Sequence, residues 1–186
     1  MNLIPLRVRP TPSAVPPRSN TGEPDGAASR SLLTRFEEYA ACWSRLIQEA
    51  RQELLIFDPD ARQLALDKAD RIEALFQFLR AAPTRRVSMV VHEVRHLEAD
   101  CPRFLRLAGQ FGGQIDVRVT CGEALRAEDC FIIADAAYVL RRPVAAQPRG
   151  VLFENDSAMA ATQRERYEQI WRETEAGLAP GALGLA

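Results

Sequence analysis

Amphipathic helical segments alternate with short apolar runs between residues 31 and 119 of this chain. In each helical segment the apolar residues recur at three- and four-residue intervals, whereas the apolar runs are as short as buried strands. Short helical crossovers between strands predict a parallel sheet with helices on both faces. We expect helices at 31–50, 67–81 and 102–111, and strands at 53–58, 86–91 and 115–119.

The sequence after residue 130 predicts antiparallel strands and a closing helix. Asp135-Ala136 separates two apolar runs, which is typical of a tight hairpin. Asn155-Asp156-Ser157 then supplies cap residues for a last helix. The fold class is therefore α/β, with a mixed sheet flanked by helices. The expected strands are 130–134, 137–140 and 150–154.

The two ends of the chain differ in composition from its middle. Residues 1–30 hold six of the twelve prolines, together with two glycines and several serines. Proline blocks helices and removes a backbone donor, and few large apolar groups are present there to offset the entropy of ordering. We expect a disordered tail over 1–30, one domain over 31–176 and a flexible C-terminal tail over 177–186.

The charge balance argues against several classes of partner. The chain carries 24 Lys and Arg against 25 Asp and Glu, a formal net charge of −1. Binding of nucleic acid through bulk electrostatics needs a basic excess, which is missing. No stretch approaches the ~20 apolar residues that cross a bilayer. We therefore expect a cytoplasmic protein that binds neither membrane nor nucleic acid.

The four cysteines show no CxxC pair, so we expect free thiols in a reducing compartment. Cys101 precedes Pro102 at the predicted start of a helix, a position that lowers the pKa of a thiol. No histidine lies at a helical spacing that would make it a base for this thiol. We interpret Cys101 as a packed, inert side chain.

The segment from His92 to His96 matches HExxH, a zinc-binding pattern of metallopeptidase helices. However, it directly follows the strand predicted at 86–91. Residues four apart on a strand lie about 13 Å from each other, too far for both histidines to hold one ion. A helical alternative stays open, because Val94 and Leu97 continue a 3.6-residue period. A zinc hydrolase using His92, Glu93 and His96 is the competing interpretation.

Several segments together carry a resemblance to a known family. They are residues 53–58, 90–104, 131–135 and 169–173, with Leu183-Gly184-Leu185 after them. In this order the chain resembles the single-copy phospholipase D-like fold. More closely, it resembles an uncharacterised proteobacterial family with that fold, domain of unknown function 7931. The resemblance runs from about Leu32 to Leu185.

Catalytic members of that superfamily carry the motif HxKxxxxD. Its histidine attacks phosphorus, and its lysine holds the phosphate charge. Aligning the aspartate on Asp135 puts Glu128 in the place of the histidine and Cys130 in the place of the lysine. A Gly-Ser pair expected further on is replaced within 141–143. A carboxylate repels a phosphodiester and a neutral thiol cannot replace an ammonium, so the resemblance implies the fold without the usual phosphohistidine chemistry.

The remaining candidate ligand-binding residues are Asp135, Arg141, Arg142 and His92. Asp135 also has a local explanation, because aspartate favours tight turns. The two arginines suit a phosphate or a carboxylate, although exposed arginines at a strand end are the favoured interpretation. We expect no catalytic residue, no metal and no cofactor at this site.

The function that this reasoning favours is a non-catalytic phospholipase D-like domain, a bacterial pseudoenzyme that binds or scaffolds. Its expected partner is an anionic small molecule or a protein. A homodimer is a further expectation, because single-copy members of the superfamily pair side by side. Besides the zinc hydrolase, residual phosphodiesterase activity through other residues is the second alternative.

Overall fold

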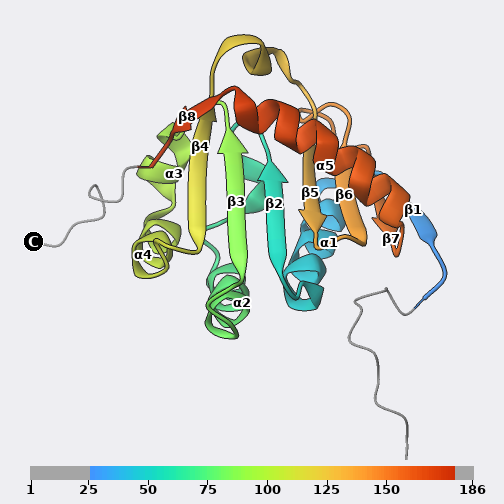
Figure 1. The fold of residues 1–186 in the computed structure, drawn as a ribbon, viewed down its shortest axis with the longest axis horizontal. Helices are drawn as coiled ribbons and strands as arrows, with labels where there is room; N and C mark the ends of the chain where they lie inside the picture. The colour runs from blue at the N-terminus through green and yellow to red at the C-terminus, as the bar shows by residue number, and fades with distance from the viewer. Residues whose placement is uncertain (1–25, 179–186) are drawn as a thin grey trace, which may run out of the picture.

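The structure, a computed structural model, describes residues 26–178. Within them, eight strands form one mixed sheet in the order β1-β7-β6-β5-β2-β3-β4-β8 (Figure 1). Neighbours β2, β3 and β4 run parallel, and the other neighbouring pairs are antiparallel. The strands are β1 (Ser29–Leu33), β2 (Glu53–Phe57), β3 (Arg86–Val91), β4 (Ile115–Thr120), β5 (Cys130–Ala134), β6 (Tyr138–Arg142), β7 (Gly150–Glu154) and β8 (Thr174–Ala176).

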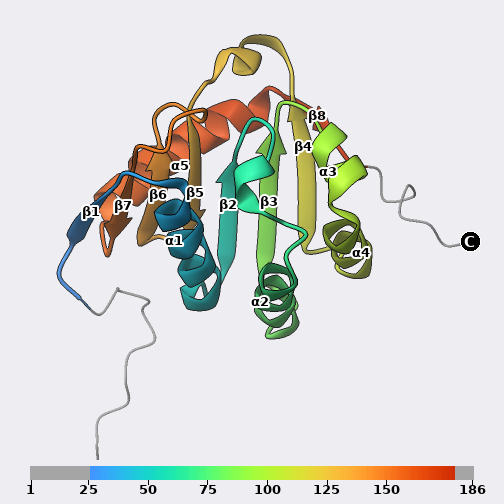
Figure 2. The ribbon, with the colours of Figure 1, turned by 180° about the vertical axis from the view of Figure 1, so that it is seen from behind.

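Helices cover the sheet on both faces, as the sequence predicts. Helix α5 crosses one face diagonally between β7 and β8 (Figure 1), and the other α-helices lie on the opposite face (Figure 2). The crossovers β2–α2–β3 and β3–α3–α4–β4 produce the three parallel strands. The helices are α1 (Phe36–Glu49), α2 (Ala69–Arg80), α3 (Arg95–Asp100), α4 (Pro102–Gln110) and α5 (Ser157–Arg172), with short 3₁₀ turns η1 (Arg62–Leu64) and η2 (Gly122–Arg126).

The sheet separates two apolar cores. On the side of α1 to α4, the core includes Trp43 and Phe104, both fully buried. On the side of α5, Phe57 and Phe131 pack against Tyr167. Every residue of β5 is buried, because this strand lies between the two cores. Each large apolar side chain buried in this way contributes about 1.5–3 kcal/mol, so the two cores hold the sheet edge that carries the candidate site in place.

The first helix begins later than the sequence predicts. We expected helix from residue 31, but Ser29–Leu33 forms the edge strand β1, which pairs antiparallel with β7. Leu32 fits a helical period, yet its side chain is 71% exposed on this strand. Glu38 caps α1 instead, because its carboxylate accepts the Thr34 and Arg35 backbone N–H groups. Strand pairing outweighed the helical period, as tertiary context often does.

The ends of the domain are defined by the two edge strands. The expected boundary at residue 30 falls inside β1, and the short strand β8, which the sequence analysis did not predict, pairs with β4. The tail predicted over 1–30 lies outside the described residues as far as residue 25, and the C-terminal tail lies outside them from residue 179.

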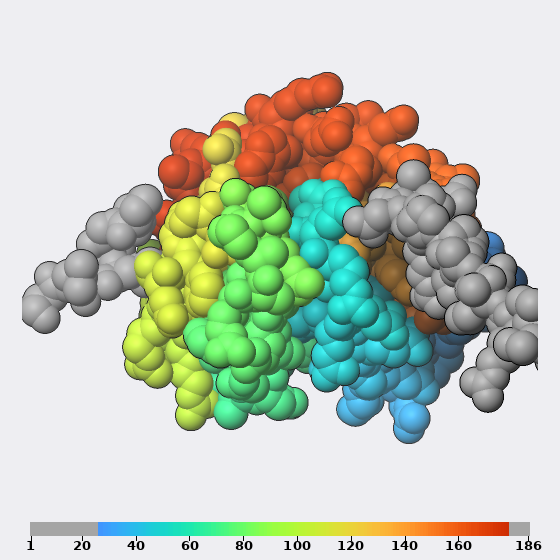
Figure 3. Space-filling model, turned by 60° about the horizontal axis from the view of Figure 1, so that its bottom comes forward, coloured from blue at the N-terminus to red at the C-terminus, as the bar shows by residue number. Residues whose placement is uncertain are grey.

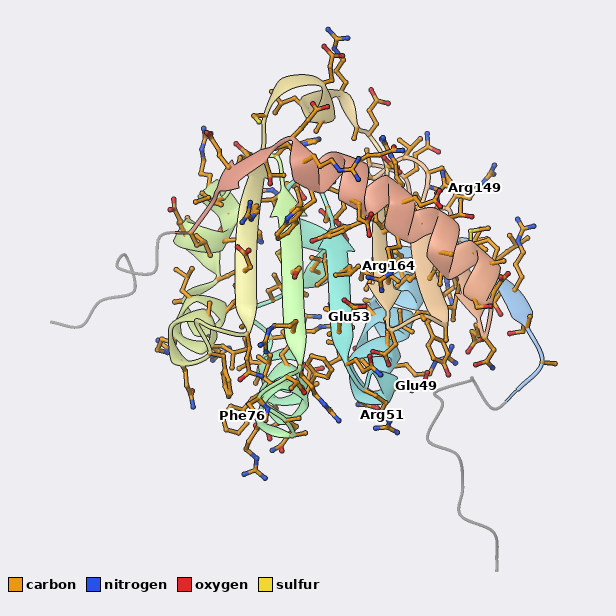
Figure 4. The ribbon with its side chains drawn as sticks, in the orientation of Figure 1. Glu49, Arg51, Glu53, Phe76, Arg149 and Arg164 are labelled. Carbon is orange, nitrogen blue, oxygen red and sulfur yellow. The ribbon has the colours of Figure 1, made fainter. Side chains whose placement is uncertain are left out.

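The hairpin predicted at Asp135 is present and has a specific anchor. Asp135 adopts a left-handed conformation, with φ of 54°. Its carboxylate accepts the backbone N–H groups of Arg51, Gln52 and Glu53 at 2.8, 2.8 and 3.0 Å. Arg164 of α5 pairs with Glu53 beside it and donates to the Asp135 carbonyl oxygen (Figure 4). Asp135 therefore ties the start of β2 to the end of β5.

Within residues 26–178, no helix combines the length and the apolar composition that spanning a membrane requires.

Candidate functional site

The carboxyl ends of the parallel strands form one edge of the sheet, where ligands commonly bind in open α/β folds. Asp58 follows β2, His92 follows β3, and Thr120 ends β4. The antiparallel pair β5–β6 brings Cys130 opposite Arg142 at the same edge. We call Tyr39, Asp58, Cys130 and Arg142 the inner corner, because all four side chains meet on the α1 side of this edge.

Arg142 fills the inner corner. It is 1% exposed, and its Nη2 lies 3.4 Å from Oδ2 of Asp58, which is 2% exposed. Nη1 donates to the Ala145 carbonyl oxygen at 2.7 Å. The guanidinium carbon lies 4.4 Å from the ring centre of Tyr39 and 5.3 Å from that of Phe36. The guanidinium is thus already paired with a carboxylate and stacked on aromatic rings, while its buried Nε has no hydrogen-bond partner among the described residues.

Burial and neighbouring titratable groups together determine the pKa shifts of the inner corner. Burial raises the pKa of Asp58, and the Arg142 guanidinium opposes this shift. The Oδ1 atom of Asp58 also accepts the Ala61 N–H at 2.8 Å. Burial lowers the pKa of Arg142, but its acidic neighbours outweigh that effect and the pKa is raised. Arg142 therefore stays charged, and Asp58 is its counter-ion.

Cys130 supplies neither a nucleophile nor a charge to this corner. It is fully buried, with Sγ 3.9 Å from the Tyr39 hydroxyl oxygen. Burial raises the pKa of Cys130 to about 12, so the sulfur is a neutral thiol at pH 7. Glu128, at the position aligned with the motif's histidine, is exposed. Neither side chain resembles the attacking and charge-holding groups that a phosphodiesterase needs.

The structure separates the ligand-binding residues that the sequence analysis grouped together. Asp135 lies at the other end of β5 from the inner corner. Arg141 and Arg142 alternate along β6, so their side chains point to opposite faces of the sheet. The expectation of an exposed Arg142 is wrong, because the side chain is an internal ion-pair partner. Asp135, Arg141 and Arg142 therefore do not lie together on one face at one end of the sheet.

His92 and His96 have separate partners. His92 Nδ1 lies 2.7 Å from Thr120 Oγ1 and its Nε2 lies 2.8 Å from the Ala127 carbonyl oxygen. A neutral ring that donates from Nε2 and accepts at Nδ1 leaves no lone pair for an ion. His96 lies on α3, which begins only at Arg95, so the two histidines do not share a helix. Among residues 26–178, no group of three His, Cys, Asp or Glu could hold a metal ion.

One cluster contradicts the sequence analysis. Cys101 does have a histidine within reach: its Sγ lies 3.7 Å from His96 Nε2, and His96 Nδ1 lies 2.8 Å from Asp100 Oδ2. We call these three residues the junction triad, because they lie where α3 meets α4. A break between the two short helices places position 101 beside position 96. The i, i+4 spacing of His96 and Asp100 was the available signal.

The helical face carries further hollows. Figure 3 shows a furrow between α2 and the segment that joins α1 to β2. A cavity of about 490 Å³ there is lined by Ile47, Phe78 and polar side chains of α2. Another, of about 420 Å³, lies between α2 and α4 beside Phe76. Arg85 lines the first of these cavities, and its buried Nε has no hydrogen-bond partner among the described residues.

Comparisons with known proteins agree with this architecture. The family model "Domain of unknown function (DUF7931)" matches residues 35–177. The chain belongs to this family. Its fold is phospholipase D-like, as the solved structures below show. No curated protein sequence matches the chain.

Three solved structures share the fold at low identity. Nuc from Salmonella typhimurium, described as a phospholipase D family member, is 14% identical with a TM-score of 0.60, over 82% of this chain and 100% of its own. NucT from Helicobacter pylori is 12% identical with a TM-score of 0.52, over 82% and 100% of the two chains. Phosphatidylserine synthase from Haemophilus influenzae is 15% identical with a TM-score of 0.56, over 84% of this chain and 41% of its own.

Proposed function

We propose that this chain is a non-catalytic phospholipase D-like domain that binds or scaffolds instead of cleaving phosphodiesters. The observation that carries the proposal is the inner corner, where the Arg142–Asp58 pair and Cys130 occupy the strand ends with their own side chains. A phosphodiester entering there would have to displace Asp58 from Arg142. It would also meet the Glu128 carboxylate in the place of a nucleophile.

Hydrolysis of bis(4-nitrophenyl) phosphate tests this proposal. We expect no release of 4-nitrophenolate above the buffer blank, with or without added divalent cations. Turnover by the purified protein that is lost in a Glu128→Gln variant would overturn the proposal and favour the residual phosphodiesterase. Glu128 is exposed, so the substitution should leave the fold intact, and a loss of turnover would then reflect the missing carboxylate.

The choice between an anionic ligand and a protein partner depends on the same corner. Because Arg142 is already paired, a free anion gains little there, and we favour a protein partner. The exposed side of the β4–β5 connection offers a contact point, since Leu125 in η2 is 53% exposed. Isothermal titration with inorganic phosphate should give no heat of binding, and a micromolar affinity lost in Arg142→Met would favour the anionic ligand.

The zinc hydrolase lacks a supporting arrangement, because His92 and His96 bond to different neighbours. Metal analysis of the purified protein should find no stoichiometric zinc. Stoichiometric zinc that is lost both in His92→Ala and in His96→Ala would reverse this conclusion.

A homodimer and a cytoplasmic location are part of the proposal. Four free cysteines are consistent with a reducing compartment. Size-exclusion chromatography with light scattering at micromolar protein tests the dimer. We expect a mass of two chains that falls towards one chain in Leu125→Glu, and a monomer at all concentrations would contradict the dimer.

A further inference from the structure

The junction triad joins an acid, an imidazole and a thiol in one hydrogen-bonded line. Asp100 Oδ2 lies 2.8 Å from His96 Nδ1, and His96 Nε2 lies 3.7 Å from Cys101 Sγ. Helix α3 carries the acid and the histidine four residues apart on one face, and the chain then turns into α4 at Cys101. Neither the fold nor the inner corner uses this line.

The hydrogen bonds define which groups carry protons. Asp100 accepts from His96 Nδ1–H, so the lone pair of Nε2 faces the thiol of Cys101. Burial, together with Asp67 and Asp100, raises the pKa of Cys101 to about 11. The resting sulfur is therefore a thiol whose proton points to His96, and it needs that base to react. This is the geometry of a nucleophile with a base and a group that orients the base.

The triad lines a cavity of about 410 Å³ whose rim carries three basic side chains together with the carboxylates of Asp67 and Asp100. Cys101 is 1% exposed, so a reagent reaches its sulfur only through this cavity. Arg62, Lys68 and Arg103 also line it. Arg62 pairs with Asp60 and Arg103 with Asp67, whereas Lys68 is exposed and forms no ion pair with the described residues. An anion entering the cavity can therefore pair with Lys68 without displacing a carboxylate.

We propose that Cys101 is a nucleophile for small anionic acyl esters or thioesters, with His96 as its base and Asp100 holding His96. The Sγ lone pair forms a bond to the acyl carbon while the Sγ proton passes to His96 Nε2. The bond from that carbon to the ester oxygen or thioester sulfur breaks, and the leaving group takes the proton from His96. Water can then hydrolyse the Cys101 thioester by the same proton path. This activity belongs to the junction triad alone, whereas the proposal of a non-catalytic domain concerns phosphodiester cleavage at the inner corner, so each of the two can fail without the other.

Two matched acyl probes test the proposal on the full chain. The protein is treated with mono(4-nitrophenyl) succinate, which is anionic, or with 4-nitrophenyl acetate, which is neutral. Acylation of each cysteine is followed by peptide mass spectrometry. For each cysteine, the acylation rate with the succinate probe is divided by the rate with the acetate probe. We expect this ratio to be at least fivefold larger for Cys101 than for Cys121. Cys121 is the internal control, because it is exposed and lies outside the cavity.

Two variants separate the roles. His96→Gln should slow acylation of Cys101 about 100-fold, in the range of general base catalysis, and leave Cys121 unchanged. Lys68→Gln, at an exposed position, should slow only the succinate reaction at Cys101. The proposal fails if Cys101 is acylated only after unfolding in guanidinium, or if its rates in both variants equal those of the parent. Thermal melts followed by circular dichroism confirm that each variant is folded.

Discussion

The inner corner and the junction triad contain the same kinds of side chain and use them in opposite ways. Each has a carboxylate, a cysteine with a raised pKa and an arginine nearby. In the inner corner the arginine and the carboxylate bury each other, and the cysteine packs beside the Tyr39 hydroxyl. At the junction the carboxylate is bound to a histidine, and the cysteine borders a cavity. The same residue types can therefore form a closed ion pair or a reactive site. The difference is whether a base, such as the His96 imidazole, lies beside the thiol at the edge of a cavity.

The largest effect should come from breaking the ion pair of the inner corner. Arg142→Met leaves Asp58 buried without a partner and should lower the free energy of unfolding by about 3–5 kcal/mol. Urea denaturation measures this loss. The double variant Arg142→Met/Asp58→Asn should recover at least half of it, because the uncompensated charge is gone. A loss below about 1 kcal/mol would show that the Arg142–Asp58 pair is not excluded from solvent.

Asp135 lies at the end of β5 opposite to Cys130. Its substitution measures how much stability a carboxylate with a purely structural role contributes. Asp135→Ala removes the acceptor of three backbone N–H groups and should cost about 2–3 kcal/mol in urea denaturation. Asp135→Asn, which tolerates the left-handed conformation and keeps one acceptor, should cost less. Equal losses in the two variants would contradict the role given to the side-chain acceptor and to the left-handed conformation.

The two buried thiols should make the protein sensitive to alkali. The folded pKa values of Cys130 and Cys101 are raised to about 12 and about 11, above the ordinary value of 9.0. The folded state therefore holds these protons longer than the unfolded state does. Stability is fully present below pH 9 and falls as the pH rises towards 11 and 12, by up to about 1.4 kcal/mol per pH unit for each thiol.

Single substitutions show which thiol causes the loss of stability at high pH. The free energy of unfolding is measured by urea denaturation at pH 8.5, 9.5 and 10.5. Cys130→Ala and Cys101→Ala should each flatten the slope, whereas Cys121→Ala, at an exposed position, should leave it as in the parent. An unchanged slope in Cys130→Ala would show that solvent reaches the inner corner.

The smallest effect should come from the junction, and it would separate stability from reactivity. The side chain of Asp100 is 58% exposed, so Asp100→Asn should change the free energy of unfolding by less than about 0.5 kcal/mol. The same variant should slow acylation of Cys101, because His96 loses its orienting charge. A stability loss above about 1.5 kcal/mol would make Asp100 a structural residue.

The sequence predicted the fold better than the sites, for a physical reason. Hydrophobic period identifies strands such as 53–57 and helices such as 157–172, because burial follows the repeat of each element. It could not separate β1 from α1, since Leu32 fits the helical pattern while its strand depends on pairing with β7.

The sites depend on contacts between distant elements, which spacing does not encode. The partner of Arg142 is Asp58, 84 positions away, and nothing local marks either as buried. Cys130 is the first residue of β5 and Glu128 lies two residues before it, so the hairpin register places both near this edge of the sheet. The contact between Cys101 and His96 was missed, because the change of direction between α3 and α4 brings the two side chains together only in three dimensions.

The first and last strands of the sheet lie at its opposite edges. Seven interstrand spacings separate β1 from β8, which is roughly 34 Å at about 4.8 Å each. Fluorophores or partner modules attached beyond the two ends of this domain would thus be held apart by a rigid spacer one sheet wide. Energy transfer between such labels would report directly whether the sheet is intact.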